Sequence, residues 1–437
     1  MRVGNRRIFL TSLLAKIGFL GSLLLVSGCE NEPYAPVAAM QISSTAEKQS
    51  SPAAALPNHL PPESIKTYHG LTMEEWKQRL KMIGPGVPGI EEFVPGLEEL
   101  ATDREAPPLL RRQATLMLGR LGKASLATLP AIEAMLLEES TESAHPSAWA
   151  AKAIALWGPL AQESTPQVIA VLDEEETPFE TRLTCLEALA QIGSRHIRVI
   201  PTLIRQLKSP SENSPRQEQL DLKMATIDAL AKIGAEASIA VPKLLSMIDH
   251  ENDLLRHKVV IALGNMGPSA APSATALAEH LVFDDAEEVR RESALSLARL
   301  GPEGESLLIN LCSDEEAFVR ELSLNALGTI PSKRPIVNRT LLASLDDDHQ
   351  RVRLEAAKAL LPTNAAEHRQ RLLNTLAELL LKADRRIRRE AADVIVEMKP
   401  SPEDWDKLEK QLEPASDEYT QRLWKSLKAF RDRQLSP

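Results

Sequence analysis

The 437-residue chain is poor in aromatic residues, which make up 3% of it, and in cysteine, of which it has three. A core with so few rings must be filled by Leu, Ile, Val and Ala, which suits packed helices better than sheets. Runs in which apolar and polar residues alternate are nearly absent, so strands are not expected. No CxxC pair occurs, and the sequence therefore predicts neither a zinc site nor a redox dithiol.

The sequence also lacks the local motifs of the commoner enzymes. It contains no HExxH, no GxSxG and no P-loop, and its nine histidines are scattered. We therefore predict no catalytic residue, no metal and no cofactor, and we expect a protein that is not an enzyme.

Acidic residues outnumber basic ones, and the net charge is −10. The first 28 residues carry four basic groups and no acid, so the rest of the chain carries −10 − 4 = −14. Such a body repels phosphate groups, and nucleic acid is therefore not expected as a partner.

The N-terminus has the features of an export leader. A basic start is followed by an apolar run of about ten residues, too short to cross a bilayer. The run ends in Val26-Ser27-Gly28-Cys29, which resembles a bacterial lipobox. The resemblance implies a lipoprotein signal peptide over 1–28, lipidation of Cys29 and a place on the periplasmic side of the cell envelope. The alternatives are an ordinary signal peptide and an uncleaved anchor.

Two details bear on export and sorting. The segment around Arg6-Arg7 resembles the twin-arginine motif but departs from it at Asn5 and Thr11, so either export route is open. Glu30, where an aspartate would retain a lipoprotein at the inner membrane, slightly favours the outer membrane.

Residues 29–67 are rich in Pro, Ser and Ala and have no apolar periodicity. They are predicted to form a flexible tether with a reach of roughly 30–35 Å. Folded sequence is expected to begin near Leu71. There Thr72 and Glu75 fit a capping box that would start an N-terminal capping helix.

One pattern then recurs about every 35 residues. Its marker is a glycine at the end of a helix, or a substitute for it, with Leu or Ile four positions earlier, mostly Ala five earlier and mostly a base eleven earlier. The markers are Gly122, Gly158, Gly193, Gly234, Gly267, Gly301, Pro331, Asn364 and Lys399. Leu and Ala suit close packing between neighbouring helices, and glycine adopts the positive φ that ends a helix.

This pattern resembles the HEAT repeat of the phycobilisome-lyase-like type. The resemblance implies an all-α fold, an α-solenoid of about nine HEAT-like helical hairpins with capping helices. The predicted solenoid covers residues 68–401, and residues 402–437 are expected to form closing helices. In such stacks, turn acids such as Asp285, Asp314 and Asp348 would pair with bases of neighbouring units. The resemblance thus implies a structural ladder formed by Arg290, Arg320, Arg353 and Arg388.

The helix that carries each marker should line the concave face of the solenoid, by the same resemblance. Positions nine and two before the marker share a helix face and are mostly polar. The second unit differs, with Trp149 and Leu156 at these positions. They are the candidate partner-binding residues, unless residues 138–146 cover them as local core.

The sequence as a whole predicts a lipid-anchored envelope scaffold that binds a protein partner in a HEAT-repeat groove and meets the membrane through its N-terminal lipid. The partner is not identified by the sequence. An alternative is an enzyme or accessory factor for cofactor attachment, lyase-like or metal-dependent hydroxylase-like, with a site built across repeats. Against the hydroxylase, His250-Glu251 is the one His-Glu pair, where two irons need several. A structural spacer is the third possibility.

Overall fold

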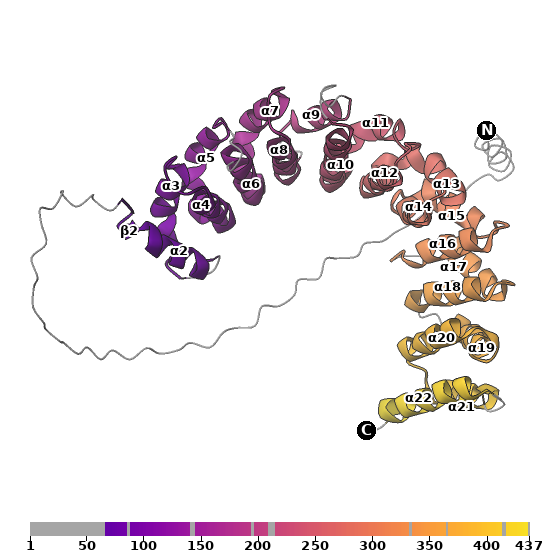
Figure 1. Cartoon of the computed structure of the whole chain (residues 1–437). Helices are drawn as coiled ribbons and strands as arrows, with labels where there is room; N and C mark the ends of the chain where they lie inside the picture. Colours follow the sequence, from indigo (N-terminus) through magenta and orange to yellow (C-terminus); the bar gives the residue numbers. More distant parts are fainter. Residues whose placement is uncertain are drawn as a thin grey trace, which may run out of the picture.

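The computed structural model describes residues 66–84, 88–139, 145–193, 196–208, 215–331, 334–363, 366–412 and 417–435. Within these ranges the chain is almost entirely helical. The exception is one antiparallel pair of two-residue strands, β1 (Thr67–Tyr68) and β2 (Leu71–Thr72). The predicted all-α solenoid is confirmed, and Figure 1 shows it as an open arch of stacked helical hairpins.

Each hairpin places its first helix on the outside of the arch and its second on the inside (Figure 1). The outer helices are α3 (Val94–Thr102), α5 (Leu129–Met135), α7 (Thr165–Asp173), α9 (Val199–Gln206), α11 (Val241–Leu245), α13 (Ala274–Phe283), α15 (Pro302–Leu311), α17 (Pro335–Ala343) and α19 (Ala366–Lys382). The inner helices are α4 (Pro108–Leu121), α6 (Pro146–Trp157), α8 (Phe179–Ile192), α10 (Arg216–Ile233), α12 (Asp253–Asn265), α14 (Glu287–Arg299), α16 (Ala317–Gly328), α18 (Gln350–Leu360) and α20 (Arg385–Met398). These nine hairpins match the nine predicted units.

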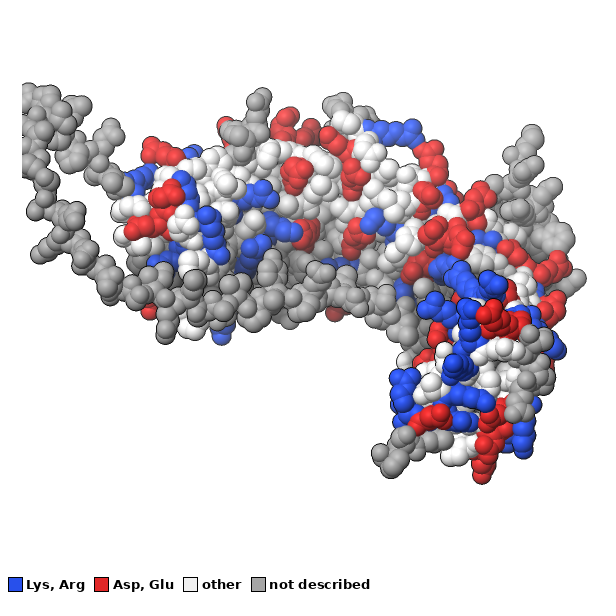
Figure 2. Space-filling view, turned by 60° about the horizontal axis from the view of Figure 1, so that its bottom comes forward, with Lys and Arg blue, Asp and Glu red and all other residues white. Residues whose placement is uncertain are grey.

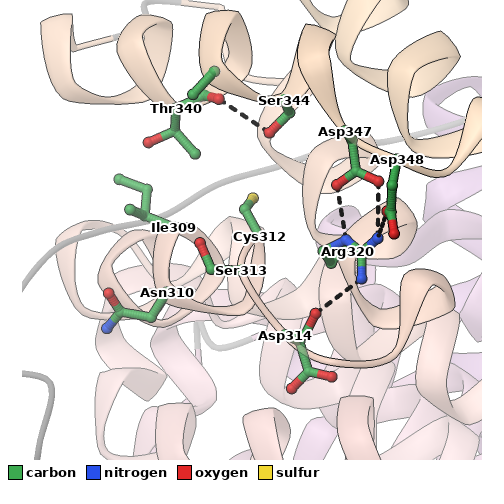
Figure 3. A pocket seen from close by; sticks show the side chains of 11 residues that line it. Ile309, Asn310, Cys312, Ser313, Asp314, Arg320, Thr340, Ser344, Asp347 and Asp348 are labelled. Carbon is green, nitrogen blue, oxygen red and sulfur yellow. Dashed lines mark hydrogen bonds and ion pairs between the residues drawn. The ribbon is translucent and has the colours of Figure 1, made fainter.

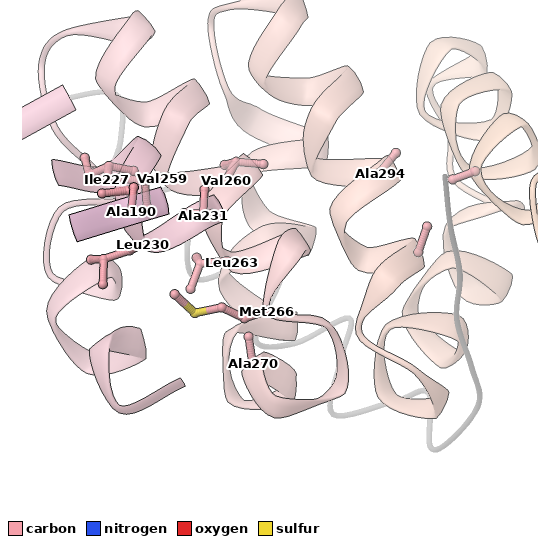
Figure 4. Packing of buried hydrophobic residues seen from close by; sticks show 14 of the residues in the cluster. Ala190, Ile227, Leu230, Ala231, Val259, Val260, Leu263, Met266, Ala270 and Ala294 are labelled. Carbon is pink, nitrogen blue, oxygen red and sulfur yellow. The ribbon is translucent and has the colours of Figure 1, made fainter. Parts of the chain in front are cut away.

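The core runs along the seams between hairpins. Figure 4 shows Leu230 of α10 and Leu263 of α12 among small neighbours such as Ala231, and both leucines are fully buried. A buried leucine contributes about 1.5–3 kcal/mol. Alanine contributes less area but allows the helix axes to approach. The recurring Ala-Leu pair of the sequence is therefore the packing unit of each seam.

Glycines inside three inner helices mark the closest approaches. A Cβ atom on Gly119 would lie 2.9 Å from the Cα of Ala153 in the next inner helix. On Gly264 it would lie 2.3 Å from the Oγ of Ser296, and on Gly328 2.8 Å from the Cβ of Ala359. These contacts leave no room for a methyl group, so neighbouring inner helices touch at backbone level.

The marker glycines end the inner helices with a positive φ, as predicted. Gly122 has φ 59° and ψ −125°, and Gly158 has φ 53° and ψ −124°. The ψ values lie outside the usual left-handed helical region, in a conformation that glycine alone adopts readily. The chain then turns through a short 3₁₀ helix, η2 (Gly122–Thr128) or η3 (Gly158–Ser164), into the next outer helix.

The N-terminal end of the solenoid differs from the expected boundaries. Ordered chain begins before Leu71, because β1 and β2 form a small hairpin that precedes α2 (Met73–Met82). Tyr68 is buried, and its hydroxyl donates to Asp103 at 2.6 Å. The indole of Trp76 donates to the carbonyl of Tyr68 at 3.0 Å. The prediction of a capping box is confirmed, since Thr72 and Glu75 exchange both hydrogen bonds.

The opposite end is closed by α21 (Pro402–Leu412) and α22 (Glu418–Leu435). Trp405 is buried and lies 6.4 Å, between ring centroids, from Trp424. Both rings belong to the buried core, and α21 and α22 pack against α19 and α20 of the last hairpin. Among the described helices, none has the length and apolar content needed to cross a bilayer.

Candidate functional site

The predicted partner-binding residues lie together on the inner face of α6. Leu156 is 42% exposed and Trp149 is half-buried. They stand seven residues apart, about two helical turns, with Lys152 between them on the same face. Figure 1 places α6 on the inside of the arch, and α6 packs against α4, α5 and α8, so we infer that its exposed side lines the inner face.

The neighbouring helix α4 continues this surface. Leu109 is 65% exposed and Leu116 is half-buried, and their spacing of seven residues puts them on one face of α4. The close contact at Gly119 brings α4 against α6, since a Cβ there would lie 3.0 Å from the Cβ of Leu156. Apolar side chains that are exposed or half-buried thus occur on two adjacent inner helices, and we refer to Leu109, Leu116, Trp149 and Leu156 together as the apolar patch. Lone exposed apolar residues are normal on a protein surface, whereas a group of this kind often marks an interaction site.

The inner face changes character towards the C-terminal end, where it carries an ion-pair network that the sequence did not reveal. Arg351 of α18 bonds to Glu321 of α16 at 3.1 Å and to Glu390 of α20 at 2.7 Å. Lys358 bonds to Glu355 at 2.9 Å and to Glu390 at 2.6 Å. Three successive inner helices are joined in this way. Figure 2, which brings the underside of the arch forward, shows dense charge over the C-terminal units and wider uncharged areas over the N-terminal half.

This network controls the titration of its acids. Burial by itself raises the pKa of Glu390, but hydrogen bonds from Lys358 and Arg351 outweigh it and lower the pKa to about 2. Burial likewise lowers the pKa of Lys358, and its bonds to Glu390 and Glu355 leave a net rise. Both groups are therefore held in their charged forms, which identifies the network as a set of satisfied structural pairs.

The four arginines of the predicted ladder lie at the edge of the solenoid where the outer helix turns into the inner helix. Arg320 donates to both carboxyl oxygens of Asp347 in the next unit, at 2.8 Å each, and to Asp348 at 2.8 Å. It also donates to the carbonyl of Asp314 in its own turn, at 3.0 Å. Each such arginine can therefore hold its own turn closed and tie it to the next unit.

The other three arginines follow parts of the same scheme. Arg290 bonds to Glu316 at 2.8 Å and to the carbonyl of Leu281 at 2.9 Å. Arg388 bonds to Asp417 at 2.8 Å. Arg353 donates to the carbonyls of Asp347 and Asp348, at 2.7 and 3.2 Å.

The acids of the ladder differ in part from those expected. Asp348 does pair with an arginine of a neighbouring unit, but Asp285 and the carboxylate of Asp314 make no arginine bond among the described contacts. Asp314 lies six residues before Arg320, but the arginine of the preceding unit, Arg290, bonds to Glu316 instead. The acids that do receive that arginine are Asp284 and Asp347, which also lie six residues before an arginine. Each caps its own turn by accepting a backbone N–H two residues on, and then receives the arginine of the preceding unit.

Asp284 belongs to a cluster that sequence reasoning missed. It accepts from Arg256 at 2.7 and 2.9 Å and contacts His280 at 2.7 Å. Although burial raises the pKa of Asp284, the bonds from His280 and Arg256 outweigh it, so the pKa lies well below its usual value. An acid followed by an arginine at +6 and preceded by one at −28 is the signal that would have found this pair.

A pocket of about 670 Å³ opens beside the ladder, between α15, the turn before α16 and the end of α17 (Figure 3). Its walls include Asn310, Cys312, Thr340 and the ion pair of Arg320 with Asp347. The thiol of Cys312 is buried, and burial raises its pKa far above the usual value. A protonated thiol is a poor nucleophile, so Cys312 is not activated for covalent chemistry.

Two further expectations concern metals and lipidation. Among the described residues, no group of three or more His, Cys, Asp or Glu side chains is arranged to hold a metal ion. Cys29, the predicted lipidation site, lies outside the described residues.

The fold, with its two-helix units and apolar seams, defines an α-solenoid. Residues 216–298 and 274–361 match the family of HEAT repeats, which is about a third of the chain. The remaining hairpins continue the same arrangement on both sides.

Similar solved structures include yeast importin-beta, with 15% identity, coverage of 78% of this chain and 52% of that one, and a TM-score of 0.46. The complex of CpcE and CpcF of phycocyanin lyase from Nostoc is 19% identical, covers 64% and 94%, and has a TM-score of 0.32. An engineered protein is 18% identical, covers 77% and 98%, and has a TM-score of 0.38. The comparison with curated proteins finds no match. A ligand must therefore be argued from this chain's own residues.

Proposed function

We propose that this chain is a protein-binding scaffold that holds its partner on the inner face of the solenoid, with Trp149 and Leu156 as the anchor. The observation that carries the proposal is the apolar patch formed by α4 and α6. Tryptophan contributes a large, stiff contact area, and such residues often dominate binding energy at protein interfaces. Towards the C-terminal end of the inner face, by contrast, Arg351 and Lys358 are paired with Glu390 within the chain.

The proposal includes the predicted anchor. Lipidation at Cys29 would tether the solenoid to the periplasmic side of an envelope membrane, slightly favouring the outer one, through residues 29–67. Metabolic labelling with an alkyne fatty acid tests this part. The wild type should be labelled and found with membranes, whereas Cys29→Ser should be unlabelled and released. Labelling that persists in Cys29→Ser would rule out this anchor.

In-cell crosslinking tests the binding face. A photo-reactive amino acid at position 149 or 156 should give one dominant crosslinked protein, identified by mass spectrometry. The same group at Gln167, an exposed position on the outer helix α7, is the matched control and should not give that product. Equal products from both faces, or none from the inner face, would refute the proposal.

Trp149→Ala separates binding from stability. Because Trp149 is only half-buried, we expect the recovery of the partner to fall at least tenfold while the melting temperature stays close to that of the wild type. A large fall in the melting temperature would instead show that Trp149 is local core.

The alternative of a cofactor-attachment factor remains testable in the same preparation. An absorption spectrum and an elemental analysis of the purified full chain would reveal a bound chromophore or metal, and either one would favour this alternative.

A further inference from the structure

The inner face begins with two helices that contain no acid. In α4 and α6 the charged residues are Arg111, Arg112, Arg120 and Lys152, and there is no Asp or Glu. Arg111 is buried and bonds to Glu138 at 3.0 Å. Lys152 bonds to Glu187 of α8 at 2.6 Å. Arg112 and Arg120 are exposed and form no ion pair with any described residue.

Inner-face cations further along the arch are mostly compensated. Lys258 of α12 pairs with Asp228 of α10 at 2.6 Å, and Arg351 of α18 pairs with two glutamates. Arg389 on α20 forms no ion pair with a described residue, but Asp393 and Glu397 follow on the same helix. The first two units are therefore distinctive within the described inner face, since their positive charge has no nearby acid on its own helices.

Apolar side chains are interleaved with these arginines. On α4 the order along one face is Leu109, Arg112, Leu116 and Arg120, with spacings of three and four residues. The two arginines are eight residues apart, or about 12 Å along the helix axis. Since α4 meets α6 at Gly119, the side chain of Arg120 starts beside the exposed Leu156.

We propose that this surface binds a protein segment in which acidic residues alternate with large apolar ones. The inference rests on the proposed function and adds the chemistry of the partner. Carboxylates of the segment would pair with Arg112 and Arg120, whose guanidinium groups accept two oxygens at once. An apolar side chain of the segment would lie on Trp149 and Leu156.

The curvature of the arch favours a peptide over an anionic membrane as the partner of this surface. α4 and α6 face the hollow of the arch, with α2 at one end of it (Figure 1). A flat bilayer contacts the rim of such a surface before its inner face, whereas an extended or helical peptide can enter along the inner helices. Charge complementarity inside a concave face therefore points to a peptide.

Selection from a random 16-residue phage library on immobilised full-length protein tests this inference. We expect the recovered peptides to be rich in Asp and Glu and to contain Leu, Phe or Trp. Their affinity, measured by fluorescence anisotropy, should fall at least tenfold in the double variant Arg112→Glu, Arg120→Glu. The matched control carries the same charge change on α20, Arg385→Glu with Arg389→Glu, and should change affinity less than twofold. Circular dichroism confirms that both variants are folded.

Four results would overturn the inference. The first two are recovery of basic or neutral peptides and recovery of no peptide at all. The third is that the α4 variant binds acidic peptides as tightly as the wild type. The fourth is that the wild type binds phosphatidylglycerol vesicles but no peptide, and that the α4 variant no longer binds the vesicles. In each case, crosslinking at position 149 tells which idea has failed. If the inner-face product persists, the chain still binds a protein but not by this chemistry. If it is absent, the proposed function fails as well.

Discussion

Replacing Gly264 by alanine should loosen one joint of the solenoid and leave distant joints unchanged. A Cβ at this position would lie 2.3 Å from the Oγ, 2.8 Å from the Cβ and 3.0 Å from the Cα of Ser296, so α12 and α14 would have to separate. Alanine gains about 1 kcal/mol over glycine inside a helix. Overpacking costs about 1–3 kcal/mol, and the separation also weakens the bond from Ser296 to the carbonyl of Val260. We expect a net destabilisation of about 1–2 kcal/mol.

Hydrogen exchange measured by mass spectrometry is the assay, because each unit contacts only its neighbours and opens locally. Amides of α12 and α14 should exchange roughly 5–30 times faster, which corresponds to that free energy. Amides of α20 and α22 should be unaffected. The double variant Gly264→Ala, Ser296→Gly restores the space between α12 and α14. Its loss of stability should therefore be smaller than the sum of the losses in the two single variants. Unchanged exchange in α12, or uniform acceleration along the chain, would refute this account of the seams.

Three further predictions concern ion pairs and a thiol. Arg320→Ala removes a mostly buried partner of Asp347 and should destabilise the turn before α18 by on the order of 3 kcal/mol, seen as faster hydrogen exchange there. The pKa of Glu390 is lowered to about 2, below the unfolded value, so its stabilisation is complete above about pH 4.5 and is lost as the pH falls towards 2. The difference in urea midpoint between the wild type and Glu390→Gln should shrink over that range. Burial raises the pKa of Cys185 to about 12, so a maleimide should label this thiol only as fast as α8 opens.

Each of these predictions has its own control. Arg422→Ala breaks a pair whose side chains are 73% and 78% exposed, and it should change stability by less than about 1 kcal/mol. Equal effects of Arg320→Ala and Arg422→Ala would contradict the ladder. A pH-independent effect of Glu390→Gln would contradict the depressed pKa. Labelling of native Cys185 at the rate of a small free thiol would contradict its burial.

The repeat pattern was enough to predict the solenoid because seam packing is local in sequence. Leu230 and Leu263 occupy the same position in successive units, and the same small neighbours recur around them. The period therefore encodes the stacking directly. The hairpin at Tyr68 escaped prediction because two-residue strands leave no alternation, and its order depends on contacts with Asp103 and Trp76 in later segments.

The candidate site was only partly accessible from sequence. Trp149 and Leu156 are predicted as binding residues because they break the polar pattern of their helix positions. The network around Glu390 was not found, because its partners come from three units and no local spacing joins them. Of the ladder acids expected at Asp285, Asp314 and Asp348, Asp348 does receive the arginine of the preceding unit, and Asp284 and Asp347 provide further bonds that were not expected. Asp284 lies one residue before the expected Asp285, and this shift within the turn decides which carboxylate reaches the arginine.

The order of contacts along the arch has a mechanical consequence. Since the main helix contacts in the described part of the chain join adjacent hairpins, the solenoid behaves as a series of compliant joints, and small rotations at successive joints add up over its length. A ligand that stiffens one end changes the span of the whole arch by little, whereas a slight, uniform change in every joint moves the two ends far apart. The flexibility of the solenoid is therefore set separately at each contact between neighbouring inner helices, by whether glycine, alanine or serine occupies that contact.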